Sequence, residues 1–192
     1  MSEAQLRLKQ LRAAAEQERD PTCTDDVLTV LMRECEKIGA KKVLEIGTGR
    51  GLTSIALLLA FPVHVTTIER DVQRISSARE NFSDFGLGDR VTLLEGDAAE
   101  ILPMLGGTFD FIFLDAAKVQ YRRFLPDCKR LLRAGGVLCA DDVLLFADGV
   151  PKKRRMLAQH IEEFIQALEA DADFSVSVLT VGKGLAVAYK KV

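Results

Sequence analysis

Histidine and cysteine are scarce in this sequence of 192 residues, and those present do not form a metal-binding pattern. The chain has 2 histidines and 4 cysteines, and Cys23, Cys35, Cys128 and Cys139 include no CxxC pair. A zinc site of the usual spacing is therefore not expected. We expect the cysteines to be buried reduced thiols, since free cysteine behaves as a small hydrophobic residue. Any metal in this protein should be held by oxygen ligands.

The sequence also lacks a large excess of charge and a long apolar run. Its net charge is −2 and 48% of its residues are hydrophobic, as in ordinary soluble globular proteins. The longest uncharged run, residues 51–68, contains Pro62 and His64 and is a poor membrane span. The opening MSEAQLRLKQ carries charges where a signal peptide needs apolar residues. We therefore expect a cytoplasmic protein with no membrane partner.

Apolar segments and helical patterns alternate along the chain. Strands are predicted at residues 43–46, 63–68, 91–94, 109–114 and 137–140, with helices between them at 52–60, 72–85, 98–104 and 121–132. This order favours a parallel sheet covered by helices on both faces. A helix at 154–170 precedes two last strands, 174–180 and 185–189, which the short VGKG link makes antiparallel. The prediction is a Rossmann-like α/β fold, with a seven-stranded, mostly parallel sheet and a C-terminal antiparallel hairpin.

A chain of this length suits one well-buried core, so we expect a single domain over residues 1–192. Residues 41–192 would form the α/β core. Residues 1–40 would form a helical N-terminal segment, with a leading helix at residues 2–18.

Two of the predicted strands end in acidic residues. The run FDFIFL leads into Asp115, with Lys118 three residues later, and the run ending at residue 140 leads into Asp141 and Asp142. In open α/β sheets the ligand lies beyond the carboxyl ends of the strands, where the strand order reverses. Each Asp alone could cap the following helix, but three converging carboxylates repel one another unless a cation neutralises them. An all-oxygen site favours Mg²⁺ or Mn²⁺.

A glycine-rich loop follows the first predicted strand. The segment VLEIGTGRG, residues 43–51, lets the backbone approach a ligand closely, although its spacing differs from GxGxxG. Glu69 ends the second strand, where a carboxylate can accept both hydroxyls of a ribose. Gly96 and Asp97 follow the third strand, in a position to border an adenine. A helix cap is the competing interpretation for Glu69 and Asp97 taken singly.

From residue 41 to residue 190 the sequence resembles class I S-adenosylmethionine-dependent methyltransferases, in the metal-dependent O-methyltransferase family of the catechol and caffeoyl-CoA enzymes. VLEIGTGRG is similar to the family's first motif and TIERD to its ribose-binding acid. LDAAKVQY resembles the segment with a metal-binding Asp and a catalytic Lys, and ADDVL the metal-binding Asp-Asn pair. DAAKVQY, KKRR and VGKGLAVAYKK resemble bacterial tRNA 5-hydroxyuridine methyltransferases more closely.

The resemblance implies a role for each matching residue. The residues expected to contact S-adenosylmethionine are Glu45, Gly47, Gly49, Thr53, Glu69, Gly96, Asp97, Ala98 and Asp115. A divalent cation, Mg²⁺ or Mn²⁺, would be held by Asp115, Asp141 and Asp142. Lys118 would be the general base, with Asp115 as the second catalytic residue. The substrate would be a tRNA or a small hydroxylated aromatic molecule.

Two features depart from the family pattern. Asp142 stands where the family has Asn, which adds a negative charge to the expected metal site. The N-terminal part is shorter than in most relatives, and DPTCTDDVL matches the usual segment only loosely. The resemblance implies that this part closes over the cofactor and makes homodimer contacts.

Two other classes of function stay open at this stage. A nicotinamide-dependent dehydrogenase would need GxGxxG and gives no reason for three acids at strand ends. A non-catalytic cofactor-sensing or RNA-binding module would keep the glycine-rich loop, but it has no need of the three acids together with Lys118.

Overall fold

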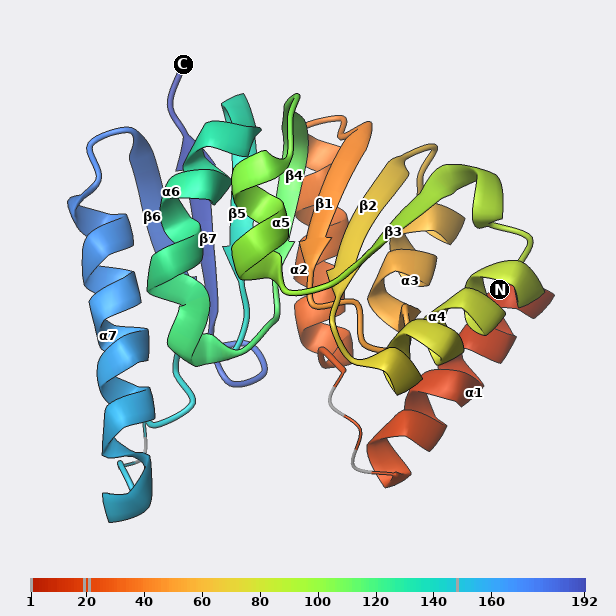
Figure 1. Cartoon of the computed structure of the whole chain (residues 1–192), viewed down its shortest axis with the longest axis horizontal. Helices are drawn as coiled ribbons and strands as arrows, with labels where there is room; N and C mark the ends of the chain where they lie inside the picture. Colours follow the sequence, from red (N-terminus) through yellow and green to blue (C-terminus); the bar gives the residue numbers. More distant parts are fainter. Residues whose placement is uncertain (1, 19, 21, 148) are drawn as a thin grey trace.

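The computed structural model describes residues 2–18, 20, 22–147 and 149–192 of the chain. Its strands form one sheet in the order β3-β2-β1-β4-β5-β7-β6 (Figure 1). The strands are β1 (Lys42–Ile46), β2 (His64–Glu69), β3 (Val91–Glu95), β4 (Phe109–Leu114), β5 (Leu132–Ala140), β6 (Phe174–Leu179) and β7 (Leu185–Lys190). β1 to β5 run parallel, and β7 is antiparallel to both of its neighbours. The predicted mostly parallel sheet with a C-terminal antiparallel hairpin is confirmed.

Helices connect the parallel strands and precede the first of them. They are α1 (Glu3–Gln17), α2 (Asp25–Lys37), α3 (Leu52–Ala60), α4 (Val72–Asp84), α5 (Ala98–Met104), α6 (Tyr121–Leu131) and α7 (Arg155–Ala170). The sequence predicted a leading helix at residues 2–18 but did not place α2, the second helix of the N-terminal segment. It is an amphipathic helix whose N-cap is Thr24, and the Thr24 hydroxyl accepts a hydrogen bond from the Val27 N–H. Within the described residues, no helix is long and apolar enough to cross a membrane.

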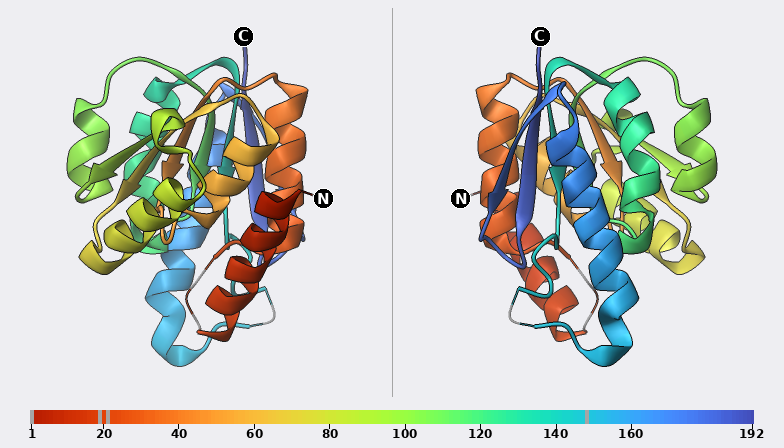
Figure 2. Two further views of the ribbon diagram at one scale, coloured as in Figure 1. Left: turned by 90° about the vertical axis from the view of Figure 1, so that its right-hand side faces the viewer. Right: turned by 90° about the vertical axis from the view of Figure 1, so that its left-hand side faces the viewer.

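Two hydrophobic cores lie on opposite faces of the sheet. Residues of α1, α2 and α3 pack with Val43 and Phe111 in one core, whereas residues of α5, α6 and α7 pack with Leu44 and Ile112 in the other. Figure 2 shows α1 and α2 on one side of the sheet and α5 and α6 on the other. Successive side chains of a strand point to opposite faces, so neighbours such as Val43 and Leu44 belong to different cores.

β5 begins five residues before the predicted start at residue 137, and α6 ends at Leu131. Leu132 pairs with Phe109, and Val137 pairs with Phe111, so the register of β4 and β5 shifts between these pairs. The extra residues include Gly135, whose φ is +70°. A bulge of this kind interrupts the apolar run without ending the strand, which is why the pattern placed the start too late.

The order of the strands reverses at β1. The chain proceeds from β1 outward to β2 and β3, then returns to place β4 on the other side of β1. The connections that leave β1 and β4 therefore diverge, and a crevice opens between them at the carboxyl edge of the sheet.

Candidate active site

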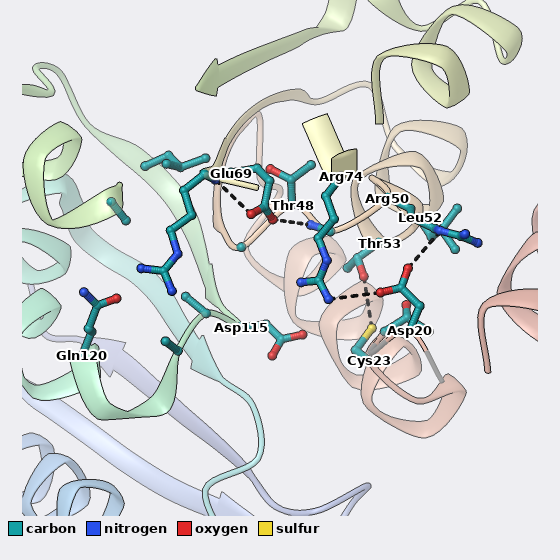
Figure 3. Close-up of a pocket in the computed structure, with 18 of the residues that line it drawn as sticks. Asp20, Cys23, Thr48, Arg50, Leu52, Thr53, Glu69, Arg74, Asp115 and Gln120 are labelled. Atoms are coloured by element: carbon teal, nitrogen blue, oxygen red, sulfur yellow. Dashed lines mark hydrogen bonds and ion pairs between the residues drawn. The ribbon is translucent and has the colours of Figure 1, made fainter. Parts of the chain in front are cut away.

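A cleft of about 320 Å³ lies at this reversal point. The predicted site residues in its lining are Gly47, Gly49, Thr53, Glu69, Gly96, Asp97, Ala98, Asp115 and Lys118. Figure 3 shows Thr53, Glu69 and Asp115 around it. Glu45, Asp141 and Asp142 are not part of this lining.

The glycine-rich loop lines the cleft between its two halves, the half at the ends of β2 and β3 and the half at the end of β4. The Gly47 and Thr48 N–H groups donate to the Ile68 carbonyl oxygen at 3.0 and 3.1 Å, which ties the loop to the end of β2. Gly47 has a φ of +103°, and a Cβ there would clash with the carbonyl oxygen of Asp115. Only glycine permits both the positive φ and this close approach to the Asp115 carbonyl. The loop can therefore lie directly against the residue that ends β4.

Glu69 presents its carboxylate to the cleft from the end of β2. Its Oε2 accepts a hydrogen bond from the Gly49 N–H at 2.9 Å, and its Oε1 accepts from the Arg70 and Asp71 N–H groups at 2.9 and 3.0 Å. These fixed donors hold the side chain in one orientation, and Oε2, which accepts only one of them, can accept a further hydrogen bond. The position suits a ligand with two adjacent hydroxyls.

Asp97 caps a helix and also lines the cleft. Its Oδ1 accepts from the Ala99 N–H at 2.8 Å and so caps α5, while Arg70 lies 3.2 Å from Oδ2. The hydrogen bond from Ala99, supported by Arg70, holds the pKa of Asp97 below its usual value. Asp97 is thus an ionised cap that also borders the cleft.

Glu45 lies beneath the cleft rather than in its wall. Its buried carboxylate accepts hydrogen bonds from the Ser54 and Thr67 hydroxyls, and the Thr67 hydroxyl is 2.6 Å from that of Thr48. Burial raises the pKa of Glu45 to about 8, although both hydrogen bonds lower it. The structure therefore shows Glu45 bracing β1 against α3 and β2, and its contact with a cofactor stays a prediction.

Asp115, which follows β4, and Asp142, which follows β5, meet at Lys118. The Lys118 Nζ lies 2.7 Å from Asp115 Oδ1 and 3.2 Å from Asp142 Oδ2, and its side chain is only 16% exposed. Burial lowers the pKa of Lys118, but the charges of Asp115 and Asp142 outweigh burial and raise it. In this arrangement Lys118 is an ammonium group.

Asp141 is the most deeply buried of the three acids, at 4% exposed. Its Oδ1 accepts from the Asp142 N–H at 2.8 Å. Burial, together with the charges of Asp115 and Asp142, raises the pKa of Asp141 to about 7. Asp142 has a φ of +60°, a left-handed conformation that Asp and Asn tolerate better than most residues.

Tyr121 holds the two acidic strand ends together. Its buried hydroxyl is shared between the Leu114 carbonyl at 3.0 Å and the Asp141 carbonyl at 3.3 Å. The ring packs edge-on against Phe164 of α7, and the Lys118 Nζ lies 5.8 Å from the ring centroid. Tyr121 thus fixes the distance between the ends of β4 and β5.

One wall of the cleft comes from residues 2–18, 20 and 22–24, which we call the N-terminal arm. Ala15, Asp20, Thr22 and Cys23 of this arm line the cleft. The Cys23 Sγ lies 3.2 Å from the Thr53 hydroxyl oxygen, and burial raises the pKa of the Cys23 thiol to about 12. The arm therefore contacts the glycine-rich half directly, and Cys23 serves there as a neutral thiol.

Residues 2–191 match the family model described as O-methyltransferase. The chain belongs to the O-methyltransferase family. A caffeoyl-CoA O-methyltransferase from Populus kitakamiensis is 30% identical over 162 residues, which cover 77% of this chain and 69% of that protein. A catechol O-methyltransferase from Niastella koreensis is 35% identical over 123 residues, which cover 61% of this chain and 54% of that protein.

Solved structures of O-methyltransferases share the fold. The O-methyltransferase TomG from Streptomyces achromogenes, involved in tomaymycin synthesis and crystallised with S-adenosylmethionine, superposes with a TM-score of 0.85 at 26% identity. The superposition covers 100% of this chain and 91% of TomG. These findings confirm the expected O-methyltransferase family, whereas metal dependence stays a prediction and the closer resemblance to tRNA-modifying members rests on the sequence motifs alone.

The acidic group of this O-methyltransferase suits a divalent cation in its chemistry. All three side chains offer oxygen ligands, which Mg²⁺ prefers. Burial, and after it the charges of Asp115 and Asp142, raises the pKa of Asp141, and a cation bound there would offset both effects. As the side chains lie, no three His, Cys, Asp or Glu residues within the described ranges are arranged to hold a metal ion. The donor chemistry fits, and joint coordination would need the carboxylates to turn.

Sequence reasoning missed several residues of the lining, among them Asp20, Arg50 and Arg74. Arg50 stands inside the VLEIGTGRG motif, and its charge in a ligand-binding loop was a usable signal. Asp20 and Arg74 are 54 residues apart in the chain, and no local pattern relates them. Only the packing of α1 and α4 around the cleft brings them together.

Proposed function

We propose that this protein transfers the methyl group of S-adenosylmethionine to a hydroxyl group that has a second oxygen beside it, with a divalent cation bound at the same site. The observation that carries the proposal is the contact of Lys118 with Asp115 and Asp142. Of this charged group, Asp115 and Lys118 line a cleft whose other half presents Glu69 and the glycine-rich loop. The family match and the S-adenosylmethionine bound to TomG support it.

The cofactor would lie across the glycine-rich loop. Glu69 would accept the ribose hydroxyls, Gly96 to Ala98 would border the adenine, and Thr53 would face the methionine part. S-adenosylmethionine would supply the methyl group as part of a sulfonium. Since Glu69 is already held by three backbone N–H groups, little reorganisation is needed when the cofactor binds.

The acceptor would bind on the side of β4 and β5. Asp115, Asp141 and Asp142 would hold the cation. A bound cation would lower the pKa of the acceptor's hydroxyl group, as metals do for bound water. The Lys118 Nζ would take the hydroxyl proton as a neutral amine. Once its ion pairs with Asp115 and Asp142 are released, burial lowers the pKa of Lys118, and the ammonium would first lose its own proton to water. Tyr121 would keep the two strand ends in register throughout.

A small catechol-like molecule is the first candidate acceptor. Two relatives are named for caffeoyl-CoA and catechol, and a catechol carries two hydroxyls on neighbouring ring carbons. Such a pair can chelate a cation while one oxygen faces the methyl donor. Positioning the two reactants in this way contributes much of the expected rate.

A 5-hydroxyuridine in tRNA is the second candidate, because its 5-hydroxyl lies beside the 4-carbonyl oxygen. The observation that favours it is a basic cluster, defined as Lys152, Lys153, Arg154 and Arg155, all of which are exposed. Lys152, Lys153 and Arg154 form a short 3-10 turn that leads into α7 at Arg155, and α7 begins at the carboxyl edge of the sheet (Figure 1). Several residues that line the cleft follow strands at the same edge. Basic residues at a helix N-terminus oppose the helix dipole and favour an anionic partner such as phosphate.

A methyl-transfer screen with labelled S-adenosylmethionine tests the proposal. The acceptors are simple catechols and bulk tRNA from a strain that lacks the enzyme, each with Mg²⁺ and with excess EDTA. Mg²⁺-dependent methylation of either acceptor supports the proposed reaction. Full activity in excess EDTA would contradict the role of the cation, and failure with both acceptors and every metal would contradict the proposed acceptors.

Substitutions in the basic cluster distinguish between the two candidate acceptors. Replacing its four residues by Gln should raise KM for tRNA and flatten the salt dependence of tRNA methylation, while catechol turnover stays unchanged. The control replaces Lys41, Lys42 and Lys191, which are exposed at the opposite edge of the sheet. If both variants treat tRNA as the parent protein does, the tRNA candidate fails.

A further inference from the structure

An ion-pair network crosses the mouth of the cleft. Asp20 Oδ2 lies 2.9 Å from the Arg50 Nε, and Asp20 Oδ1 lies 3.1 Å from the Arg74 Nη2, as Figure 3 shows. Arg50 belongs to the glycine-rich loop and Arg74 to the first turn of α4, which follows Glu69. A single carboxylate of the N-terminal arm therefore joins two elements that bound the cofactor half of the cleft.

The arm is also fixed within itself. Arg12 of α1 is 7% exposed, and its guanidinium donates to the Cys23 carbonyl at 2.6 Å and to Asp25 Oδ1 at 2.9 Å. This bond holds the Cys23 backbone against α1, and the Cys23 side chain touches Thr53 in the cleft. Arg12 thus shapes the arm, whereas Asp20 attaches the arm to the opposite side of the mouth.

Asp20 differs from an ordinary surface partner. Its side chain is 19% exposed, and those of Arg50 and Arg74 are 31% and 39% exposed. Partly withdrawn ion pairs are screened less by salt than exposed ones.

Other ion pairs also join the arm to the body. The Glu18 side chain is 57% exposed, and its Oε2 lies 2.6 Å from the Arg50 Nη2. Arg7 pairs with Asp84; these side chains are 46% and 56% exposed and lie outside the cleft lining. Exposed pairs of that kind contribute little, so this pair is a natural control.

We propose that Asp20 is a positioning residue that, through Arg50 and Arg74, keeps the N-terminal arm across the cleft mouth and slows the release of S-adenosylmethionine and S-adenosylhomocysteine. The inference rests on the proposed function, because it takes this cofactor as the occupant of the cleft. Asp20, Arg50 and Arg74 all line the cleft. Breaking the network should therefore ease the exit of the cofactor and leave Lys118 and the three acids unchanged.

The test compares the parent protein with Asp20→Asn, which keeps the side-chain size and removes the charge. S-adenosylhomocysteine release is measured by stopped-flow displacement, and its affinity by calorimetry. Release should become about five- to tenfold faster with little change in the association rate, since such changes fall mainly on dissociation. KM for S-adenosylmethionine should rise, while the single-turnover rate at saturating cofactor stays within about twofold of the parent value.

Three further variants make the test specific. Asp20→Glu keeps the charge and should restore slow release, which a merely structural role of the loop would not predict. Arg74→Gln should speed release, and adding it to Asp20→Asn should bring less than the sum of the two effects, because both break one network. Arg7→Gln, the control, should release S-adenosylhomocysteine at the parent rate.

The outcomes separate this inference from the proposed function. If the parent protein binds no S-adenosylhomocysteine, the proposed function is wrong. If the parent binds it and Asp20→Asn releases it at the parent rate, the role of Asp20 is overturned and the proposed function stands. Equal acceleration in Asp20→Asn and Arg7→Gln would mean that any loosening of the arm has this effect, which also overturns the specific role of Asp20.

Discussion

The acidic side chains on the two sides of the cleft differ in the groups that compensate their negative charge. On the side of β1, β2 and β3, each buried or half-buried acid has fixed donors: Glu69 accepts from three backbone N–H groups, Glu45 from two hydroxyls, and Asp97 from a backbone N–H and Arg70. On the side of β4 and β5, Asp115 and Asp142 share the ammonium of Lys118, and Asp141 is buried beside them.

This difference shows in which half the acidic side chains have enough hydrogen-bond donors without a bound ligand. The acids of the first half are satisfied by backbone and hydroxyl groups that do not depend on a ligand. The second half brings three carboxylates together with one cationic side chain, and burial, together with the charges of Asp115 and Asp142, raises the pKa of Asp141. A half with fixed donors beside a half with unbalanced charge is the arrangement that the proposed reaction, with its cofactor in the first half and a cation in the second, would need.

The largest effect is expected from a substitution that alters only the half with the three acids. Asp141→Ala should lower kcat by at least about 100-fold in the presence of Mg²⁺, because a proposed ligand of the cation is lost. The affinity for S-adenosylhomocysteine should stay within about twofold, since the cofactor half is untouched. Calorimetry and initial rates measure both. A parallel loss of cofactor affinity would show that the two halves are not independent.

The converse change breaks the cofactor half. Glu69→Gln should weaken S-adenosylhomocysteine binding by about 10- to 100-fold, as expected when charge-assisted hydrogen bonds are lost. The dependence of the reaction rate on Mg²⁺ concentration should not change at saturating cofactor. Calorimetry with a Mg²⁺ titration of the rate checks both, and an unaltered affinity would remove Glu69 from the ribose site.

A pH experiment sharpens the comparison within the cofactor half. The pKa of Glu45 is about 8 in the folded protein against an ordinary value of 4.5. Between these values the folded state keeps a proton that the unfolded state has released, so the free energy of unfolding falls as pH rises through this window. Glu45→Gln should remove up to about 1.4 kcal/mol of this fall per pH unit. Urea unfolding at several pH values measures it, and parallel curves for the two proteins would refute it.

The smallest expected effect concerns the acid that replaces the family's Asn. Asp142→Asn should weaken Mg²⁺ binding by about three- to tenfold, because one charge leaves the site. Activity at saturating Mg²⁺ should be retained. The Mg²⁺ dependence of the rate is the measurement, with Asp84→Asn as a surface control. An unchanged dependence would place Asp142 outside the cation's ligands.

Local patterns predicted the elements well where one physical requirement dominated. β4 matches its predicted range because a strand buried on both faces reads as a continuous apolar run. β5 was placed too late because a register shift and Gly135 interrupt its apolar run. The motifs placed Glu69, Asp97 and Lys118 in the cleft, whereas Glu45 proved to lie beneath it, since a motif does not report which way a side chain points.

The sequence by itself determined the alternation of strands and helices, and with it the acids that stand at the carboxyl edge of the sheet. Hydrophobic periodicity and chain connectivity suffice for this, because they act between residues near one another in the chain. Tertiary structure alone decided that Lys118 lies between Asp115 and Asp142, that Asp141 has a pKa of about 7, and that Asp20 reaches Arg74. Those results depend on distances and burial across packed elements, and electrostatic energies follow these quantities rather than sequence spacing.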